Sequence, residues 1–187
     1  MNHWMIAQIN EFAGQPALIW RDTQCTYGQL LDQVAQWKGE LSARGVQPGE
    51  SIAFDGDYSP NTCALLLALI DNQNIAVPLT SSVVDKKQGF LQTARAAAVF
   101  QFDSTDAWAF HRREVPDDHP LLAQLRAAGE PGLIVFTSGS TGESKATLHN
   151  FNKILVKFKQ QRAQLRALTF LLLDHLGGIN TLFYVLS

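Results

Sequence analysis

Apolar positions in the chain follow two spacings, which predict an alternation of helices and strands. Apolar residues between Leu30 and Leu41 recur at intervals of three or four, which is typical of one face of an amphipathic helix. Thr26, followed by Gln29 three residues later, predicts a capping box at the start of this helix. Gly45 predicts its end, because glycine readily adopts the left-handed conformation that follows a helix.

The same patterns predict most of the remaining elements. Ser59 followed by Pro60 marks another helix start, since proline is tolerated at the first helical position. We predict helices over about 2–12, 60–73, 83–94, 121–128 and 152–164, and strands over 16–21, 24–26, 51–54, 75–79, 97–102, 133–136, 146–148 and 168–173, with an edge strand near 108–111. This alternation predicts an α/β fold with a mostly parallel sheet flanked by helices.

One buried strand ends abruptly in a loop of glycine and hydroxyl residues. The apolar run 133–136 is followed by Thr137, Ser138, Gly139, Ser140, Thr141, Gly142, Glu143, Ser144 and Lys145. Its glycines allow successive backbone N–H groups to turn toward one anion, while the hydroxyls and the lysine add donors and positive charge. Such a run is otherwise a solvated linker, but the preceding strand and the fixed lysine favour a polyphosphate site near a sheet edge.

Two common phosphate loops do not fit this segment. A Walker loop requires glycine before its lysine and Ser or Thr after it, whereas Ser144 and Ala146 flank Lys145. The dinucleotide fingerprint requires a glycine triplet that opens a helix, which this segment lacks. The pattern Thr-Ser-Gly-Ser-Thr-Gly-x-x-Lys instead resembles the phosphate-binding signature of the adenylate-forming superfamily, which includes acyl-CoA synthetases, nonribosomal-peptide adenylation domains and luciferases. The resemblance extends to the N-terminal part of that superfamily. There, too, a helix like the one predicted through Leu41 ends near Arg44-Gly45 and is followed by a strand like the one from Ser51.

A second motif supports the same resemblance. His175, Gly177 and Gly178 resemble the His-x-Gly-Gly turn downstream of the phosphate loop in acyl-CoA synthetases. The resemblance implies that His175 lines the acid pocket and that the two glycines keep its wall open. Asp174 stands where many members carry an apolar or aromatic residue. The alternative is that Asp174 caps the N-terminus of a helix and that the two glycines only permit a tight turn. His149 and Asn150 are likewise interpreted mainly as helix-capping residues, with a phosphate or substrate role as the alternative.

The resemblance implies ATP-dependent activation of a carboxylic acid. The carboxylate attacks the α-phosphorus of ATP, pyrophosphate leaves, and the acyl-adenylate passes to the thiol of CoA or a phosphopantetheine arm. By the same resemblance, Lys145 and His175 are the candidate catalytic residues and Thr141 the candidate Mg²⁺ ligand. The candidate ATP-binding residues are Thr137, Ser138, Gly139, Ser140, Thr141, Gly142 and Lys145, and the candidate acid-binding residues are His175, Gly177 and Gly178.

Family members continue with adenine- and ribose-binding motifs and a small C-terminal domain, and none of these motifs occurs in this sequence. We therefore expect residues 1–187 to form part of the large N-terminal domain, completed by a missing C-terminal region or a partner chain. Two alternatives remain: a binding or scaffold module, including one half of a split enzyme, and a self-sufficient ATPase. Exposed apolar surface, and with it a homodimer, is a further expectation.

Composition and charge limit the classes of partner that the chain is expected to bind. Of the 187 residues 46% are hydrophobic, enough for a sizeable core, and a net charge of −2 disfavours nucleic acid as a partner. Cys25 and Cys63 are too few for a metal cluster or disulfide framework, and Asp55 with Asp57 reads as turn and cap residues. The apolar run 63–70 is too short to span a bilayer, and Asn10 and Glu11 interrupt the first residues before they could form the apolar region of a secretory leader, so we expect none. We expect a soluble, cytoplasmic protein.

Overall fold

A computed structural model describes residues 3–115, 119–138, 144–160 and 165–187. Its main feature is a six-stranded sheet in the order β6-β5-β3-β4-β7-β8. The strands are β3 (Ser51–Asp55), β4 (Ile75–Leu79), β5 (Ala98–Phe102), β6 (Trp108–Arg112), β7 (Gly132–Ser138) and β8 (Ser144–Asn150). Neighbours among β5, β3, β4 and β7 pair in parallel, whereas the edge strands β6 and β8 run antiparallel to their neighbours. The predicted α/β fold with a mostly parallel sheet is confirmed.

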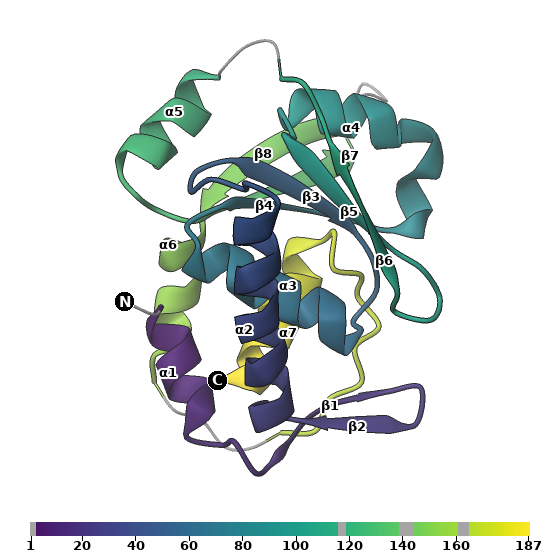
Figure 1. The fold of residues 1–187 in the computed structure, drawn as a ribbon, viewed down its shortest axis with the longest axis vertical. Helices are drawn as coiled ribbons and strands as arrows, with labels where there is room; N and C mark the ends of the chain where they lie inside the picture. The colour runs from purple at the N-terminus through teal and green to yellow at the C-terminus, as the bar shows by residue number, and fades with distance from the viewer. Residues whose placement is uncertain (1–2, 116–118, 139–143, 161–164) are drawn as a thin grey trace.

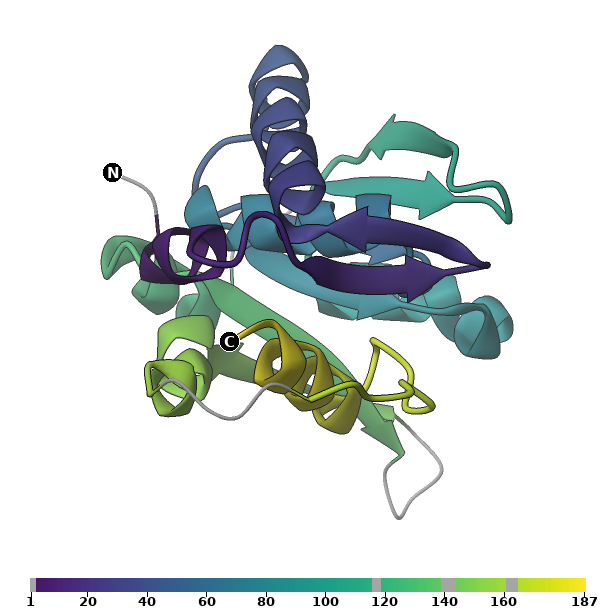
Figure 2. The same ribbon diagram turned by 90° about the horizontal axis from the view of Figure 1, so that it is seen from below.

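Helices cover both faces of this sheet, as Figure 1 shows. One face is covered by α1 (Trp4–Asn10), α2 (Tyr27–Ala43), α3 (Pro60–Asp71), α6 (Phe151–Leu155), the short 3-10 helix η2 (Val156–Phe158) and α7 (Leu176–Leu186). The opposite face carries the 3-10 helix η1 (Ser81–Lys86), α4 (Lys87–Thr93) and α5 (Pro120–Ala127). A separate hairpin of β1 (Pro16–Trp20) and β2 (Thr23–Thr26) is seen most clearly in Figure 2.

Burial of the strands explains their composition. All five residues of β4 are buried, and such continuous apolar runs are expected of parallel strands covered on both faces. Along β7 the side chains alternate: Leu133 and Val135 pack in the core on the α2–α3 side, and Ile134 packs in the core on the α4–α5 side. Two separate hydrophobic cores therefore hold the sheet between its helical layers.

Local signals fixed the helix ends. Thr26 and Gln29 form the predicted capping box of α2, and Gly45 after that helix has a φ of +66°. The Ser59 hydroxyl accepts a hydrogen bond from the N–H of Thr62 at the start of α3, with Pro60 in its first turn. Asn150 caps α6, because its side-chain oxygen accepts from the N–H of Lys153 at 3.1 Å. The capping predictions for Thr26, Ser59 and Asn150 are confirmed, whereas the one for His149 is wrong, because His149 lies in β8 and pairs with Leu133.

Two predicted elements near the C-terminal end are wrong. Residues 168–173 were expected to form a buried strand, but they have no regular secondary structure. Within this segment Leu168 is 93% exposed and Phe170 is 85% exposed, and only Leu173 is buried. The sheet edges are β6 and β8, and among the described residues no strand pairs with this segment. The helix expected over 152–164 is also shorter, since α6 ends at Leu155 and η2 at Phe158.

The β1–β2 hairpin differs slightly from the prediction. Its turn was expected at Asp22-Thr23, but Arg21 and Asp22 occupy it with φ values of 48° and 64°. Two successive positive φ values match the twist of a tight hairpin. Within the part of the chain that the structure describes, no helix combines the length and apolar character required for a membrane span.

Candidate functional site

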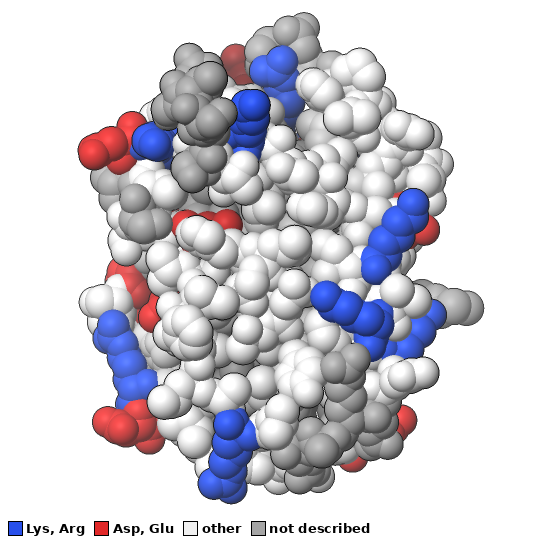
Figure 3. Space-filling model, turned by 180° about the vertical axis from the view of Figure 1, so that it is seen from behind, with Lys and Arg blue, Asp and Glu red and all other residues white. Residues whose placement is uncertain are grey.

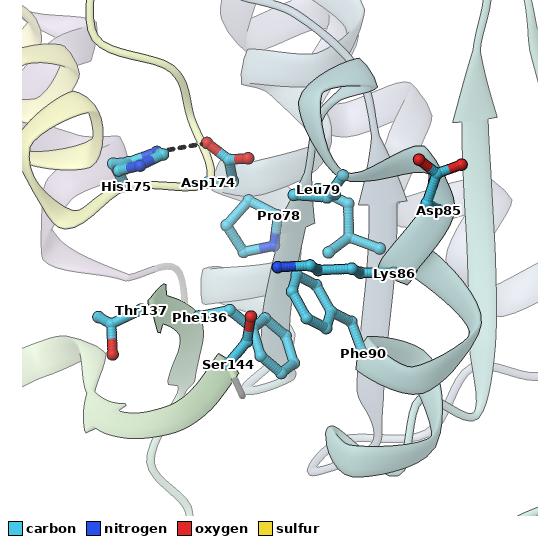
Figure 4. A pocket seen from close by; sticks show the side chains of 11 residues that line it. Pro78, Leu79, Asp85, Lys86, Phe90, Phe136, Thr137, Ser144, Asp174 and His175 are labelled. Atoms are coloured by element: carbon cyan, nitrogen blue, oxygen red, sulfur yellow. Dashed lines mark hydrogen bonds and ion pairs between the residues drawn. The ribbon is translucent and has the colours of Figure 1, made fainter. Parts of the chain in front are cut away.

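A pocket of about 270 Å³ opens where β4 and β7 end. It is lined by Pro78, Leu79, Val83, Asp85, Lys86, Phe90, Phe136, Thr137, Ser144, Asp174 and His175. Pro78 and Leu79 are the last two residues of β4, and Phe136 and Thr137 lie near the end of β7. Ligands of open α/β sheets bind outside the carboxyl ends of the strands, which is where this pocket lies. Figure 4 shows the pocket at close range.

Two aromatic rings form part of the pocket wall. The rings of Phe90 on α4 and Phe136 on β7 are stacked, with centroids 3.9 Å apart and planes 5° from parallel. Phe90 is buried, and Phe136 packs against the same core on the α4–α5 side of the sheet. This stack joins a helix to a strand, so the wall rests on two rigid elements and presents an apolar surface to a ligand.

The hairpin of β7 and β8 carries the predicted phosphate loop. Thr137 lies opposite Lys145 and Ser138 lies opposite Ser144, so the two ends of the loop are held together by ladder pairing. Thr137 and Ser144 line the pocket, and Lys145 is exposed on β8 immediately after Ser144. The loop is therefore carried between two strands at the sheet edge, as predicted.

Most of the loop itself lies outside the described residues. This applies to four of the predicted ATP-binding residues, including the predicted magnesium ligand Thr141: they are Gly139, Ser140, Thr141 and Gly142. The backbone of Ser138 belongs to β7, but its side chain lies outside the described part of the structure. The roles assigned to all these residues stay predictions.

Lys86 is a pocket residue that sequence reasoning missed. It ends η1, and in Figure 4 its side chain extends toward the centre of the pocket, whereas the carboxylate of Asp85 is directed away. The sequence pattern of 83–94 predicted only a helix. A single lysine in such a segment is not part of a recognisable binding motif. The parallel order of the strands places it across the pocket from Thr137, which the sequence pattern does not reveal.

Asp174 and His175 form a hydrogen-bonded pair at another wall of the pocket. The ring Nδ1 of His175 lies 2.6 Å from Oδ1 of Asp174, and the hydroxyl of Thr80 donates to Oδ2 of Asp174 at 2.6 Å. Asp174 is buried, whereas 62% of the His175 side chain is exposed. His175 lines the pocket, and its predicted role in binding the acid stays a prediction, while Asp174 holds the ring and does not cap α7.

The two predicted glycines occupy the first turns of α7 and are not among the residues that line the pocket. A Cβ on Gly178 would overlap the carbonyl oxygen of Leu172 and the hydroxyl of Tyr58, so this position is tightly packed. A Cβ on Gly177 would meet only the end of the Leu171 side chain, at 2.9 Å. Both glycines therefore help the segment before α7 to lie close to the helix, and a direct role in acid binding stays a prediction.

Tyr58 also holds this segment. Its hydroxyl donates a 2.6 Å hydrogen bond to the carbonyl oxygen of Leu171. Burial raises the pKa of Tyr58 well above its usual range, and the negative charges of Asp57 and Asp174 act in the same direction. Tyr58 therefore remains a hydrogen-bond donor at neutral pH.

Other charged groups near the carboxyl ends of the strands are engaged in structural contacts. Asp55 was predicted to be a turn residue, but it is the last residue of β3, and the Lys87 ammonium lies 2.7 Å from its Oδ2. Asp57 lies in the loop that follows, where it accepts from the N–H of Tyr58, as expected of a turn residue. Among the described residues, no group of three or more His, Cys, Asp or Glu side chains is arranged to hold a metal ion. On the face shown in Figure 3, Lys and Arg side chains are scattered as separate groups.

Comparison with known proteins gives consistent matches. A family model described as AMP-binding enzyme matches residues 6–187. The chain is 23% identical over 158 residues to 2-succinylbenzoate–CoA ligase from Listeria innocua, a match that covers 81% of this chain and 34% of that protein. It is 30% identical over 145 residues to delta-poly-L-ornithine synthetase from Acinetobacter baumannii, covering 69% of this chain and 10% of that protein. The chain thus spans about a third or less of these relatives.

Solved structures share the fold. The N-terminal subdomain of NpsA from Klebsiella oxytoca, in complex with 3-hydroxyanthranilyl-AMSN, matches with a TM-score of 0.77 and 21% identity over 97% of this chain and 50% of that chain. A double mutant of o-succinylbenzoate CoA synthetase from Bacillus subtilis matches with a TM-score of 0.74 and 18% identity, covering all of this chain and 42% of that one. At these identities the likeness establishes the arrangement of strands and helices.

Proposed function

This chain belongs to the AMP-binding enzyme family of adenylate-forming proteins, and on that premise we propose that it takes part in ATP-dependent activation of a carboxylic acid. In the proposed reaction, an acid oxygen forms a bond to the α-phosphorus of ATP while the bond from that phosphorus to pyrophosphate breaks. The acyl-adenylate then passes to a thiol of CoA or of a phosphopantetheine arm. The observation that carries the proposal is the pocket at the end of β7, where the hydroxyl- and glycine-rich loop begins.

Charge neutralisation is the main demand of this reaction. A carboxylate is already an anion near neutral pH and needs no base, but the phosphates of ATP repel it. Lys145 at one end of the loop and Lys86 on the opposite wall supply two positive charges at this end of the sheet. We propose that they hold the leaving pyrophosphate, together with the hydroxyl groups and N–H groups of residues 137–142. Loss of one such donor typically raises a barrier by about 2.7–4 kcal/mol.

The proposed protein ligand for magnesium lies in the loop between β7 and β8. A bound Mg²⁺ would offset phosphate charge and hold the triphosphate in line. We propose Thr141 as its protein ligand, because Mg²⁺ prefers oxygen ligands and usually keeps most of its contacts with phosphate and water.

The acid is proposed to lie against the walls formed by His175 and the Phe90–Phe136 stack. A volume of about 270 Å³ is close to the lower end of typical ligand pockets, which fits a small acid. We propose that this chain supplies the pyrophosphate loop and part of the acid pocket, and that residues 1–187 are part of a larger N-terminal domain. A further C-terminal region or a partner chain would then supply the nucleoside contacts, so we expect the isolated chain to be inactive.

Pyrophosphate binding to the isolated chain tests the role of the loop directly. We expect calorimetry to detect binding that Thr141→Ala with Lys145→Ala abolishes, while a Lys153→Ala control on α6, away from the pocket, leaves it unchanged. Acid-dependent exchange of pyrophosphate into ATP should appear when the chain is joined to the region that its relatives contain, and should be lost in the same double variant. Exchange that survives the double variant would remove the loop from the mechanism.

The alternatives give other results in the same assays. A folded chain that binds neither ATP nor pyrophosphate, with or without the remaining region, would show a scaffold module or an inactive half of a split enzyme. Steady ATP hydrolysis by the isolated chain would show a self-sufficient ATPase.

A further inference from the structure

The pair formed by Asp174 and His175 carries an inference beyond the phosphate loop. Asp174 stands at a position where many members of the resembled superfamily carry an apolar or aromatic residue. The resemblance therefore does not explain the contacts that Asp174 makes in this chain. Its carboxylate is buried and joins two elements, because Oδ2 accepts from Thr80 after β4 and Oδ1 contacts His175 before α7. Buried carboxylates are unfavourable unless hydrogen-bonded, so these two contacts matter to the fold as well as to the pocket.

The hydrogen-bond directions follow from the donors available. An ionised carboxylate can only accept, and the hydroxyl of Thr80 donates to it. The Nδ1 of His175, 2.6 Å from the other carboxylate oxygen, must then carry the proton. A neutral imidazole has one N–H, so proton placement on Nδ1 leaves Nε2 as an acceptor.

We propose that Asp174 is a positioning residue that fixes His175 in its Nδ1–H tautomer, so that the ring offers Nε2 as a hydrogen-bond acceptor to a hydroxyl or amino donor of the pocket ligand and not to its carboxylate. Thr80 completes the arrangement by holding the carboxylate from the end of the sheet. The arrangement resembles the way a carboxylate orients a histidine in other sites, where the partner of one ring nitrogen determines what the other can do. The function of Nε2 in binding an acid rests on the proposed function, whereas the tautomer does not.

The same contacts explain how an exposed side chain can be oriented. The His175 side chain is 62% exposed, and a solvated imidazole that lacks a partner rotates freely and favours the Nε2–H form. The Asp174 side chain is only 8% exposed and is anchored through Thr80. The buried carboxylate therefore fixes the imidazole ring on the pocket wall relative to the end of β4.

Nitrogen NMR of histidine-labelled chain tests the proposal without nucleotide or acid. The chain has five histidines, and His175 is assigned by the signal that a His175→Gln variant loses. Above pH 8, where an ordinary imidazole with a pKa of about 6.5 is neutral, long-range proton–nitrogen correlations distinguish the two tautomers. We expect Nδ1–H to predominate in the wild-type chain.

Asp174→Asn is the decisive variant. The Thr80 hydroxyl would still donate to the asparagine oxygen, which turns the amide NH₂ toward Nδ1 and makes that nitrogen an acceptor. We therefore expect His175 to change to Nε2–H. Asp85→Asn is the matched control, because Asp85 lines the same pocket but makes no contact with His175 among the described residues. It should leave the tautomer unchanged.

Variants that retain the fold make the result interpretable. Unchanged signals from the other histidines show that the chain remains folded, and Thr80→Val provides a second route, with a smaller fraction of Nδ1–H expected. Predominant Nε2–H in the wild-type chain, or the same tautomer in wild type and Asp174→Asn, would overturn the proposal. A chain that binds no pyrophosphate but shows Nδ1–H would remove the proposed function and leave the tautomer inference intact.

Discussion

The hydroxyl of Tyr58, in the loop just before α3, donates a hydrogen bond to the carbonyl oxygen of Leu171, which lies 113 residues later. This contact attaches the irregular segment before α7 to the helix that follows β3. Gly178 lies at the same place, since a Cβ there would overlap both Tyr58 and the Leu172 carbonyl. The position of His175 on the pocket wall therefore depends on packing between parts of the chain that are far apart in sequence.

Tyr58→Phe should lower the free energy of unfolding by roughly 1 kcal/mol at neutral pH, the usual net value of one hydrogen bond. Because burial raises the pKa of Tyr58 in the folded chain, its contribution is complete below the unfolded pKa of about 10 and is lost as the pH rises through the folded pKa. Urea unfolding at several pH values should show the difference between wild type and variant shrinking only in strongly alkaline solution. An equal difference at every pH would contradict this account.

Gly178→Ala should destabilise the chain by about 1–3 kcal/mol, because the new methyl group overlaps backbone and the Tyr58 hydroxyl. Gly39→Ala is the matched control, since Gly39 lies in α2 with nothing within 4 Å of the added Cβ. Alanine is the better helix former, so this control should gain about 0.4–1 kcal/mol. Thermal unfolding monitored by circular dichroism compares the two, and equal effects would show that the Gly178 contacts are unimportant.

Lys86→Ala should weaken pyrophosphate binding to the isolated chain by about tenfold, equivalent to 1.4 kcal/mol, if Lys86 contributes one charge contact in the proposed site. Binding by the wild-type chain should also fall as salt is added, because exposed charges are screened. Calorimetry at two salt concentrations provides the measurement, with Lys153→Ala as the lysine control outside the pocket. Undiminished binding by Lys86→Ala would place the anion elsewhere.

The two cysteines should react slowly with iodoacetamide in the folded chain. Cys63 is fully buried in α3, and burial raises its pKa far above the usual value, with nearby Asp106 and Asp57 adding to the effect. Burial also raises the pKa of Cys25. Because the thiolate is the reactive form, mass spectrometry should find little alkylation at pH 8 until urea unfolds the chain. Rapid labelling of Cys63 in native buffer would contradict its burial.

Exposed apolar residues before α7 should promote self-association. Leu168 and Phe170 are 93% and 85% exposed, and Leu165 and Ile19 are also largely exposed. We expect sedimentation to show a concentration-dependent shift toward dimers, and Leu168→Ser with Phe170→Ser to reduce it. The substitutions should leave the melting temperature nearly unchanged because neither side chain is buried. A wild-type chain that stays monomeric at high concentration would contradict the expected homodimer.

Sequence reasoning reached the elements whose signals are local. Capping at Thr26 and Ser59, the left-handed Gly45 and the fully apolar β4 all depend on residues within one element or its ends. The position of the loop between β7 and β8 at the sheet edge was also predicted correctly, since the apolar run before it and the β-prone run after it are local signals. The apolar run at 168–173 failed because such a run does not specify whether a sheet edge is available to pair with it.

By itself, then, the sequence determined the alternation of strands and helices, the phosphate-loop motif and the likeness of its histidine turn to that of acyl-CoA synthetases. Only the tertiary structure decided which of these parts meet. Lys86, Thr80 and Asp174 join the site because parallel strands place their carboxyl ends side by side, bringing the segment after β4 and the end of β7 together with the segment before α7. The physical reason is that hydrogen bonding and burial between distant segments, unlike local propensity, depend on the whole chain being folded.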